Sequence, residues 1–402
     1  MLKIVHIITR FVNGGADENT MLTCNAQATK GHDVWLVYGL EHKDRMLAKL
    51  DPRVKAMEIS SLIRAVSPRH DMGCLIGLIR LFRSIKPDVI HTHTSKAGVI
   101  GRMASIVVPS AIVVHGVHIL PFSAVPAVTR HIYVLLEKLV APLTDAYVSV
   151  SEGMKEECLA YRLGRTDRHW VIPSGMNLDQ FRRAVPACDM HGAIDGQGDN
   201  PETVRIVYVA VLERRKRHWE LIKAIAPLMA KYETLQLVFA GDGPERTRLA
   251  ALVDELGLST RIRFLGFRDD VGSVLAGSQI GVFVSEREGL PRSLVQYVLA
   301  GLPVVVTDLP GVARVVVDGE NGFVVKSDAF DDLVQRLEML VATPDLRARM
   351  SQNSRHMDLS DWDAARMTEA IEAVYAQLLA DAPPADGLRG RGVSASMGAG
   401  NV

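Results

Sequence analysis

The segment from Ser285 to Gln296 (SEREGLPRSLVQ) has residue types and a spacing suited to chemistry on an anion. An apolar stretch that predicts a strand precedes it and a predicted helix follows, so the unpaired N–H groups of the helix start face the loop. These N–H groups and the helix dipole favour phosphate groups. Glu288 can accept hydrogen bonds from hydroxyl groups, and Gln296, about two helical turns later, lies near the same face.

A run of cations, Arg214-Arg215-Lys216-Arg217, lies in the same half of the chain. Beside a bound phosphate, these cations would stabilise the negative charge that grows as a bond to the phosphate breaks. A solvated charge run at the start of a helix explains the pattern equally well. The residues alone leave both interpretations open.

In the other half, the loop Asn13-Gly14-Gly15-Ala16 follows the first predicted strand. Its glycines allow the backbone to approach a ligand closely, and the next helix points its N-terminus at the same place. Two glycines by themselves also fit a simple turn.

Two sets of alternating strands and helices must position these segments. The predicted strands are 3–8, 34–38, 54–59, 88–93, 111–115 and 146–151 in the first set, and 205–211, 235–241, 262–267, 280–285 and 303–308 in the second. Strands that alternate with crossover helices form parallel sheets covered on both faces, so the sequence predicts an α/β protein of two doubly wound domains. Ligands of such sheets bind beyond the carboxyl ends of the strands, where the segments above lie.

Composition predicts the domain limits. A polar, glycine-rich linker at 184–203 separates an N-terminal domain, 1–183, from a C-terminal domain, 204–358. A helix with Ser360 as its N-cap is predicted at 359–382, packing back towards the N-terminal domain, and a disordered tail is predicted at 383–402. Asp361 and Asp363 resemble a metal-binding DxD pair, but a helix start explains them better.

Charge and cysteine usage exclude several classes of protein. The chain carries 46 Lys and Arg against 46 Asp and Glu, so no bulk attraction to nucleic acid is expected. The four cysteines form no CxxC pair, and neither a signal peptide nor a membrane-spanning stretch is recognisable. A cytoplasmic protein is therefore expected.

Several short segments, in their order and spacing, make the chain resemble the family 4 retaining glycosyltransferases of GT-B fold (glycosyl transferases group 1) over about residues 1–380. They are GGA at 14–16, HTHTSKAG at 91–98, HG at 115–116, VSVS at 148–151, VIPSG at 171–175, GDGP at 241–244, FLG at 264–266, and the Glu288 loop with GLPVV at 301–305. The resemblance implies two Rossmann-like domains facing a central cleft, retention of the anomeric configuration, and neither a bound metal nor a cofactor.

The resemblance also implies which residues bind the donor, a nucleotide-sugar. Glu288 matches the first Glu of a Glu-x7-Glu pair and would contact the donor sugar as a catalytic residue. Gln296 replaces the second Glu and would bind the ribose as a neutral partner. The expected donor-binding residues are Gly14, Gly15, Arg214, Arg215, Lys216, Asp242, Gly243, Phe264, Leu265, Gly289, Leu290, Pro291 and Gln296.

One departure concerns the diphosphate. Val211 stands where the family has an Arg, whereas Lys216 matches the family's Lys. Arg214 or Arg215 would supply the missing charge. Gly243 would bring its turn close to the nucleotide, with Phe264 and Leu265 lining the base pocket.

Histidines and a lysine of the first half are expected near the sugar and the acceptor. His115 would lie beside the donor sugar as a second catalytic residue. His91 and His93 resemble a metal pair only superficially, because no carboxylate is close in sequence, and they are interpreted as structural or acceptor-side groups. Lys96 is expected to contact an anionic acceptor together with His93.

The donor is expected to be a UDP-sugar, with a GDP-sugar as the main alternative, and the acceptor a growing bacterial glycan or a lipid-linked glycan. Another enzyme on this fold, a sugar-nucleotide epimerase or a phosphorylase, is a second interpretation. A non-catalytic scaffold is a third, suggested by Val211 and Gln296.

The uneven distribution of charge between the two halves of the chain predicts contact with a membrane surface. Residues 1–185 hold 23 Lys and Arg against 16 Asp and Glu, a net charge of +7, and the remainder carries −7. The positive charge clusters between positions 53 and 86, in Arg53, Lys55, Arg64, Arg69, Arg80, Arg83 and Lys86. With the apolar loop 119–126, these residues predict peripheral contact with the inner face of an anionic membrane. A packed loop and solvated arginines are the alternative.

Overall fold

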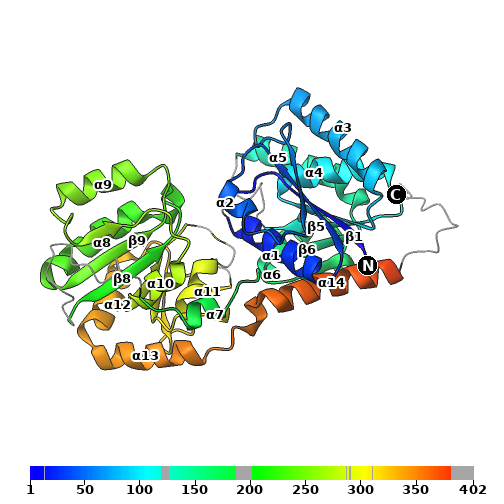
Figure 1. The fold of residues 1–402 in the computed structure, drawn as a ribbon. Helices are drawn as coiled ribbons and strands as arrows, with labels where there is room; N and C mark the ends of the chain where they lie inside the picture. Colours follow the sequence, from blue (N-terminus) through cyan, green and yellow to red (C-terminus); the bar gives the residue numbers. More distant parts are fainter. Residues whose placement is uncertain are drawn as a thin grey trace, which may run out of the picture. The chain divides into compact units, whose positions relative to one another are not determined.

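The computed structural model describes residues 1–12, 14–118, 126–186, 202–286, 288, 291–309 and 311–381. Its contacts divide the chain into two compact units (Figure 1). The first unit is Met1–Met176 together with the segment that begins at Asp361, and the second is Asn177–Ser360.

One parallel sheet forms the centre of the first unit, in the order β3-β2-β1-β4-β5-β6-β7. Its strands are β1 (Lys3–Ile8), β2 (Asp33–Gly39), β3 (Lys55–Ile59), β4 (Val89–His93), β5 (Ile112–Val117), β6 (Ala146–Ser149) and β7 (His169–Val171). Its helices are α1 (Gly15–Thr29), α2 (Asp44–Leu47), α3 (Pro68–Ile85), α4 (Ser95–Ala104), α5 (Ala127–Val140), α6 (Glu152–Ala160) and α14 (Ala364–Ala380).

Successive residues of β1 pack on opposite faces of this sheet, as expected for a parallel sheet covered on both sides. Val5 and Ile7 join a core made with α3 and α4, whereas Ile4 joins a core made with α14. The C-terminal helix α14 also packs against α1, so α1 and α14 cover one face while α3 and α4 cover the other (Figure 1).

The start of α14 corrects one prediction. Ser360–Trp362 form a short 3-10 helix of their own. The N-cap is therefore Asp363 rather than Ser360, and its carboxylate accepts hydrogen bonds from the N–H groups of Ala365 and Arg366. Capping thus accounts for this carboxylate, as expected for an acidic residue at a helix start.

A second parallel sheet, in the order β10-β9-β8-β11-β12-β13, forms the centre of the second unit. Its strands are β8 (Val204–Val209), β9 (Leu235–Ala240), β10 (Ile262–Phe264), β11 (Ile280–Phe283), β12 (Val304–Thr307) and β13 (Gly322–Val325). Its helices are α7 (Asp179–Arg182), α8 (His218–Lys231), α9 (Arg246–Glu255), α10 (Val271–Ala276), α11 (Arg292–Leu299), α12 (Phe330–Ala342) and α13 (Pro344–His356).

The division of the chain lies before the predicted limit at residue 183. The first unit ends at Met176, because α7 packs against α10 and α11 of the second unit. Most of the predicted linker, residues 187–201, and the whole predicted tail lie outside the described residues. Two short strands, β7 and β13, are absent from the predicted set.

No helix in the described part of the chain combines the length and the apolar character that crossing a bilayer requires.

Candidate functional site

Two loops meet where the strand order of the second sheet reverses. β8 and β11 are neighbours in that sheet, and each continues at its carboxyl end into a loop. The loop after β8 contains a short 3-10 helix, η5 (Arg214–Lys216), and the loop after β11 contains Glu288. Doubly wound sheets bind their ligands at such a switch point.

The carboxylate of Glu288 lies between two cations. Its Oε1 accepts a hydrogen bond from Lys216 Nζ at 2.5 Å and another from the Arg215 guanidinium. Ser285 Oγ donates to the same oxygen at 3.3 Å. The side chain of Glu288 is 16% exposed and that of Lys216 is 9% exposed, so water screens this charge cluster only weakly.

Lys216 is held in place on several sides. Its Nζ lies 4.6 Å from the centre of the Phe283 ring, and the hydroxyl of Tyr208 donates to its backbone carbonyl at 2.9 Å. Burial lowers the pKa of Lys216, while the negative charge of Glu288 acts in the opposite direction. The carboxylate therefore helps to keep this buried lysine charged.

Arg214 and Arg215, which the sequence leaves as alternatives for the missing Arg, have different surroundings in the structure. Arg215 bonds to Glu288 and also pairs with Glu213 at 2.6 Å. Arg214 is exposed instead and lines a cavity of about 250 Å³. Since Val211 is 52% exposed and has no charge, Arg215 is the better placed replacement for the missing Arg.

The loops after β8 and β9 pack backbone against backbone. A Cβ added to Gly243 would lie 2.5 Å from the carbonyl oxygen of Leu212, and the Leu212 N–H donates to the carbonyl of Asp242 at 3.0 Å. Only glycine leaves room for this approach. Gly243 therefore tightens a turn, as expected, and its contact with a nucleotide stays a prediction.

The other residues of the second unit that are expected to bind the donor are less closely grouped than Arg215, Lys216 and Glu288. Phe264 stacks on Phe239 with ring centres 5.1 Å apart, and the guanidinium of Arg246 covers it at 4.4 Å. Leu265 continues this strand end, Pro291 precedes α11 as its N-cap, and Gln296 is half-buried on α11. Gly289 and Leu290 lie outside the described residues.

In the first unit, the glycine loop is organised by a residue that the sequence analysis does not single out. Gly14 is the N-cap of α1 and Gly15 is its first residue. Asp17 Oδ2 accepts hydrogen bonds from the N–H groups of Gly14 at 2.8 Å and Val12 at 3.1 Å. An acid in the first turn after a glycine pair is the signal that could have identified Asp17.

Two predicted site residues of the first unit, Lys96 and His115, contact other residues of the same unit. Lys96 Nζ pairs with Asp71 at 2.5 Å and is 15% exposed. His115 Nδ1 hydrogen-bonds to Thr92 Oγ1 at 2.9 Å, and burial together with Arg102 holds the pKa of His115 well below its usual value. Both side chains thus have intramolecular partners, and their roles towards acceptor and sugar stay predictions.

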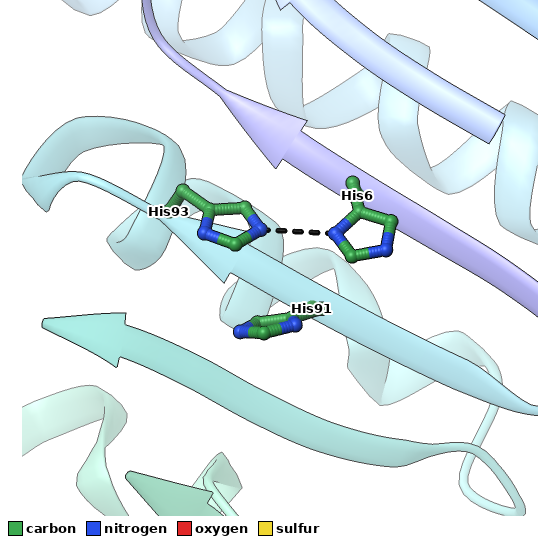
Figure 2. A group of neighbouring side chains, drawn as sticks. All are labelled: His6, His91 and His93. Carbon is green, nitrogen blue, oxygen red and sulfur yellow. Dashed lines mark hydrogen bonds between the residues drawn. The ribbon is translucent and has the colours of Figure 1, made fainter. Parts of the chain in front are cut away.

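Four histidines form a connected group, the histidine cluster (His6, His91, His93 and His118). Figure 2 shows His6 on β1 and His91 and His93 on β4. One imidazole nitrogen from each of these three rings lies within 4.8 Å of those of the other two. His93 links the group, with Nε2 at 3.0 Å from His6 Nδ1 and Nδ1 at 3.0 Å from His118 Nε2. Burial lowers the pKa of His6 to about 4, so the ring is neutral near pH 7.

The sequence pattern places only His91 and His93 together, at the end of one predicted strand. β1 lies beside β4, and the register places His6 directly opposite His91. Because a doubly wound sheet commonly places its first strand next to its fourth, this pairing was the available signal for His6.

The backbone is strained where β4 ends. Thr94, which directly follows His93, has φ of 64° and ψ of 163°. A β-branched residue at positive φ costs on the order of 1–3 kcal/mol. Its hydroxyl lies 2.9 Å from that of Thr9, which holds it in this conformation.

Helix α5 carries an apolar face that is exposed. Its large apolar residues with exposed fractions between 39% and 75% are Val128, Ile132, Leu135, Leu136 and Leu139. This spacing of three and four residues places them on one side of the helix. The predicted interface loop, 119–125, lies outside the described residues, so α5 is the apolar surface that the structure describes.

Most of the predicted basic residues belong to α3 and its ends rather than to α5. α3 and α5 both pack against α4 (Figure 1). Of the predicted basic residues, Arg64, Arg69, Arg80, Arg83 and Lys86 are exposed on or beside α3. Arg53 and Lys55 instead pair with Asp51 and Asp33.

Comparisons with known proteins place both halves of the chain. Residues 13–180 match the family described as Glycosyltransferase Family 4, and residues 194–357 match Glycosyl transferases group 1. The UDP-Gal:alpha-D-GlcNAc-diphosphoundecaprenol alpha-1,3-galactosyltransferase of Escherichia coli is 27% identical over 334 residues, which are 82% of this chain and 86% of that enzyme. The capsular polysaccharide biosynthesis glycosyltransferase CapM of Staphylococcus aureus is 22% identical over 323 residues, which are 78% and 82% of the two chains.

The fold agrees with these matches. The crystal structure of HepE from Anabaena in complex with UDP and glucose superimposes with a TM-score of 0.77 at 18% sequence identity, covering 94% of this chain and 100% of that chain. Two parallel sheets of reversed strand order confirm the predicted GT-B architecture of two Rossmann-like domains. The chain therefore belongs to the family 4, group 1 glycosyltransferases.

Proposed function

We propose that this glycosyltransferase moves a sugar from a UDP-sugar to a glycan or lipid-linked glycan during the synthesis of a bacterial surface polysaccharide. The arrangement of Arg215, Lys216 and Glu288 at the switch point is the observation that carries the proposal. The E. coli relative is named for a UDP-sugar donor and a diphosphoundecaprenol-linked acceptor, and the HepE complex contains UDP.

The charge cluster suits the departure of a nucleoside diphosphate. As the bond between the sugar and the diphosphate breaks, its electron pair leaves with the phosphate oxygen, and negative charge grows there. Arg215 and Lys216 would stabilise that charge in a site that water reaches poorly. Glu288 would accept a hydrogen bond from a donor-sugar hydroxyl and fix the orientation of the ring.

Retention of the anomeric configuration belongs to this proposal. The acceptor oxygen would bond to the anomeric carbon on the face that the diphosphate leaves. NMR of the product made from an α-linked donor measures the outcome directly. An α-linked product is expected, and a β-linked product would exclude retention.

The proposal also holds that no metal ion bridges the donor phosphates. Arg215 and Lys216 together bring two positive charges, which match the charge of a divalent cation at that position. UDP affinity is therefore expected to be the same with EDTA as with added Mg²⁺ or Mn²⁺. A large loss of affinity on chelation, restored by either ion, would contradict this.

A thermal-shift panel tests the donor class. UDP, GDP, uridine, several UDP-sugars and inorganic phosphate are compared on the full chain. A nucleotide at 100 times its Kd should stabilise the fold by about 2.7 kcal/mol. Stabilisation by UDP-sugars is expected. Stabilisation by GDP-sugars alone would change the donor, and a response to inorganic phosphate without any nucleotide response would favour a phosphorylase.

We further propose that the first unit works at the inner face of an anionic membrane. The exposed apolar side of α5 would enter the lipid interface, while the basic residues near α3 would attract anionic headgroups. Each basic residue near such a surface contributes roughly 1 kcal/mol. A lipid-linked acceptor would then meet the enzyme at the membrane surface.

A further inference from the structure

A small cavity lies against the histidine cluster in the first unit. Its volume is about 10 Å³, and its lining includes His91, His93, His118, Gly116 and Asn19. This is close to the minimum space that a single water molecule needs. The cavity can therefore hold one ion or one water molecule and little else.

Two polar atoms in that lining are buried and lack a hydrogen-bond partner. They are His91 Nε2 and Asn19 Oδ1. Buried polar groups nearly always have a partner, and an exception points to an ion or water molecule at that place. His91 and Asn19 both line this cavity, so one species bound in it would have both residues as neighbours.

Three imidazole nitrogens converge on one point beside Gly116. A Cβ added to Gly116 would lie 3.0 Å from His93 Nδ1, 3.1 Å from His118 Nε2 and 3.3 Å from His91 Nε2. Glycine at this position leaves the convergence point open. A zinc ion takes nitrogen ligands at about 2.0–2.1 Å, so the rings would need to close in by about 1 Å.

The spacing of the nitrogens also suits a shared ion. Two ligands of a tetrahedral zinc ion lie about 3.3 Å apart, given the zinc–nitrogen distance. His93 Nδ1 and His118 Nε2 are 3.0 Å apart. A metal shared by these two nitrogens would replace their direct contact, and the rings would still need to close in on it by about 1 Å.

The outer nitrogens of the rings are held by other buried groups. His93 Nε2 contacts His6 Nδ1 at 3.0 Å, and His6 Nε2 contacts Gln27 Oε1 at 2.8 Å. If His6 Nε2–H donates to Gln27, then His93 Nε2–H donates to His6, and the Nδ1 lone pair of His93 is directed towards Gly116. His91 Nδ1 lies 2.5 Å from the Tyr375 hydroxyl, which leaves His91 Nε2 for the cavity. Metal-binding histidines are typically oriented by such partners on the other ring nitrogen.

We propose that His91, His93 and His118 bind one divalent transition-metal ion of the zinc type, with Asn19 beside its fourth coordination position. Imidazole is a preferred ligand of Zn²⁺, Cu²⁺, Ni²⁺ and Fe²⁺ and a poor one for Mg²⁺ and Ca²⁺. Three protein ligands leave one position for a water molecule, whose O–H would donate to Asn19 Oδ1. Every residue of this site belongs to the first unit, whereas Arg215, Lys216 and Glu288 belong to the second.

Equilibrium dialysis of the full chain against Zn²⁺, followed by elemental analysis, tests the proposal. One zinc ion per chain with a Kd of about 1 µM or tighter is expected, and Co²⁺ in its place should give the visible absorption of a tetrahedral complex. Wild-type protein that retains no metal under these conditions would overturn the proposal and leave the cavity to a water molecule.

Two variants locate the ion. Gly116→Ala keeps all histidines but places a methyl group at the convergence point, and His118→Asn removes one ligand. Each should weaken zinc binding at least tenfold. The matched controls are Gly77→Ala, whose Cβ would meet its nearest neighbour at an ordinary 3.6 Å, and His169→Asn, a buried histidine outside the cluster. Wild-type affinity in both Gly116→Ala and His118→Asn would place the metal elsewhere and overturn the site.

Discussion

The carboxyl ends of β4 and β5 in the first unit carry neutral histidines, whereas those of β8 and β11 in the second lead to paired charges. His91, His93 and Lys216 are buried, whereas the side chain of Arg215 is 42% exposed. In the second unit Glu288 offsets the cost of burying Lys216, so the lysine keeps its charge. In the first unit burial lowers the pKa values of His91 and His93, and the neighbouring histidines lower them further.

The difference shows how similar sheets acquire different ligands. Arginine and lysine side chains donate charge-assisted hydrogen bonds, which an anion such as a diphosphate accepts. Neutral imidazoles have no net charge but present lone pairs, which attract a metal ion. The side chains near the carboxyl ends of the strands, rather than the topology of the sheets, would decide which kind of ligand each unit binds.

The largest effect is expected when the carboxylate of the charge cluster is removed. Glu288→Ala should lower sugar transfer by a hundredfold or more (order of magnitude), because it removes both the sugar contact and the group that positions Lys216. Initial rates with a radiolabelled UDP-sugar, together with a circular dichroism spectrum, measure transfer and folding separately.

Glu286→Ala provides the matched control, since Glu286 lies on the same loop and is exposed. It should keep transfer within a few-fold of wild type. Wild-type turnover in a folded Glu288→Ala protein would show that the charge cluster is not the reacting site.

The second prediction concerns His218, a buried histidine of the second unit. Burial, together with the charge of Lys216, lowers the pKa of His218 to about 3. The folded state therefore binds fewer protons than the unfolded state between about pH 3 and pH 6.5, so stability is fully present above this range and is lost as the pH falls through it. From about pH 7 to pH 5, this histidine should cost the fold about 2 kcal/mol.

Urea unfolding of wild type and His218→Phe at both pH values measures this loss. Phenylalanine keeps the stacking on Tyr208, where the ring centres lie 4.5 Å apart, but cannot take up a proton. The variant should lose about 2 kcal/mol less than wild type on acidification. An equal loss in both proteins would mean that His218 does not titrate in this way.

Much of this arrangement follows from local sequence. β1 occupies Lys3–Ile8 as predicted, since a β-branched, apolar run between polar residues leaves little ambiguity. β7 and β13, of three and four residues, are absent from the prediction, although β10 and β12 of the same lengths are included in it, so strand length alone does not explain the difference.

The sequence predicts which loops form the site but not which residues of those loops contact each other. The sequence identified the loops of Glu288 and Lys216, yet the two residues are 72 positions apart, and only the folded sheet shows which arginine joins them. His6 and His93, 87 positions apart, meet for the same reason. Such contacts depend on strand order and register, which no local pattern specifies.

The third prediction separates the two arginines of η5. Arg215→Ala should weaken UDP binding about twentyfold, since a hydrogen bond to a charged group contributes roughly 1.5–3 kcal/mol. Uridine, which lacks the diphosphate, should bind almost as before. Isothermal titration calorimetry with both ligands measures the difference.

Arg214→Ala is the comparison, because this neighbouring arginine is exposed and makes no contact with Glu288 that the structure describes. It should change UDP affinity less than threefold (order of magnitude). If Arg214→Ala weakens UDP binding more than Arg215→Ala does, the assignment of the compensating charge is reversed.

The smallest effect is expected at the surface of the first unit, where α5 exposes apolar residues and α3 exposes basic ones. Ile132→Ser and Leu135→Ser should each weaken co-sedimentation with anionic vesicles about fivefold, because each removes part of an apolar side chain from the lipid interface. Binding should require anionic lipid and decrease as salt screens the exposed charges. Met339→Ser, which changes an exposed apolar residue of the second unit, should leave vesicle binding unchanged. If wild-type protein ignores anionic vesicles at low salt, the membrane proposal fails and a soluble acceptor is favoured; if Met339→Ser weakens binding as much as the α5 variants do, the contact is not specific to the first unit.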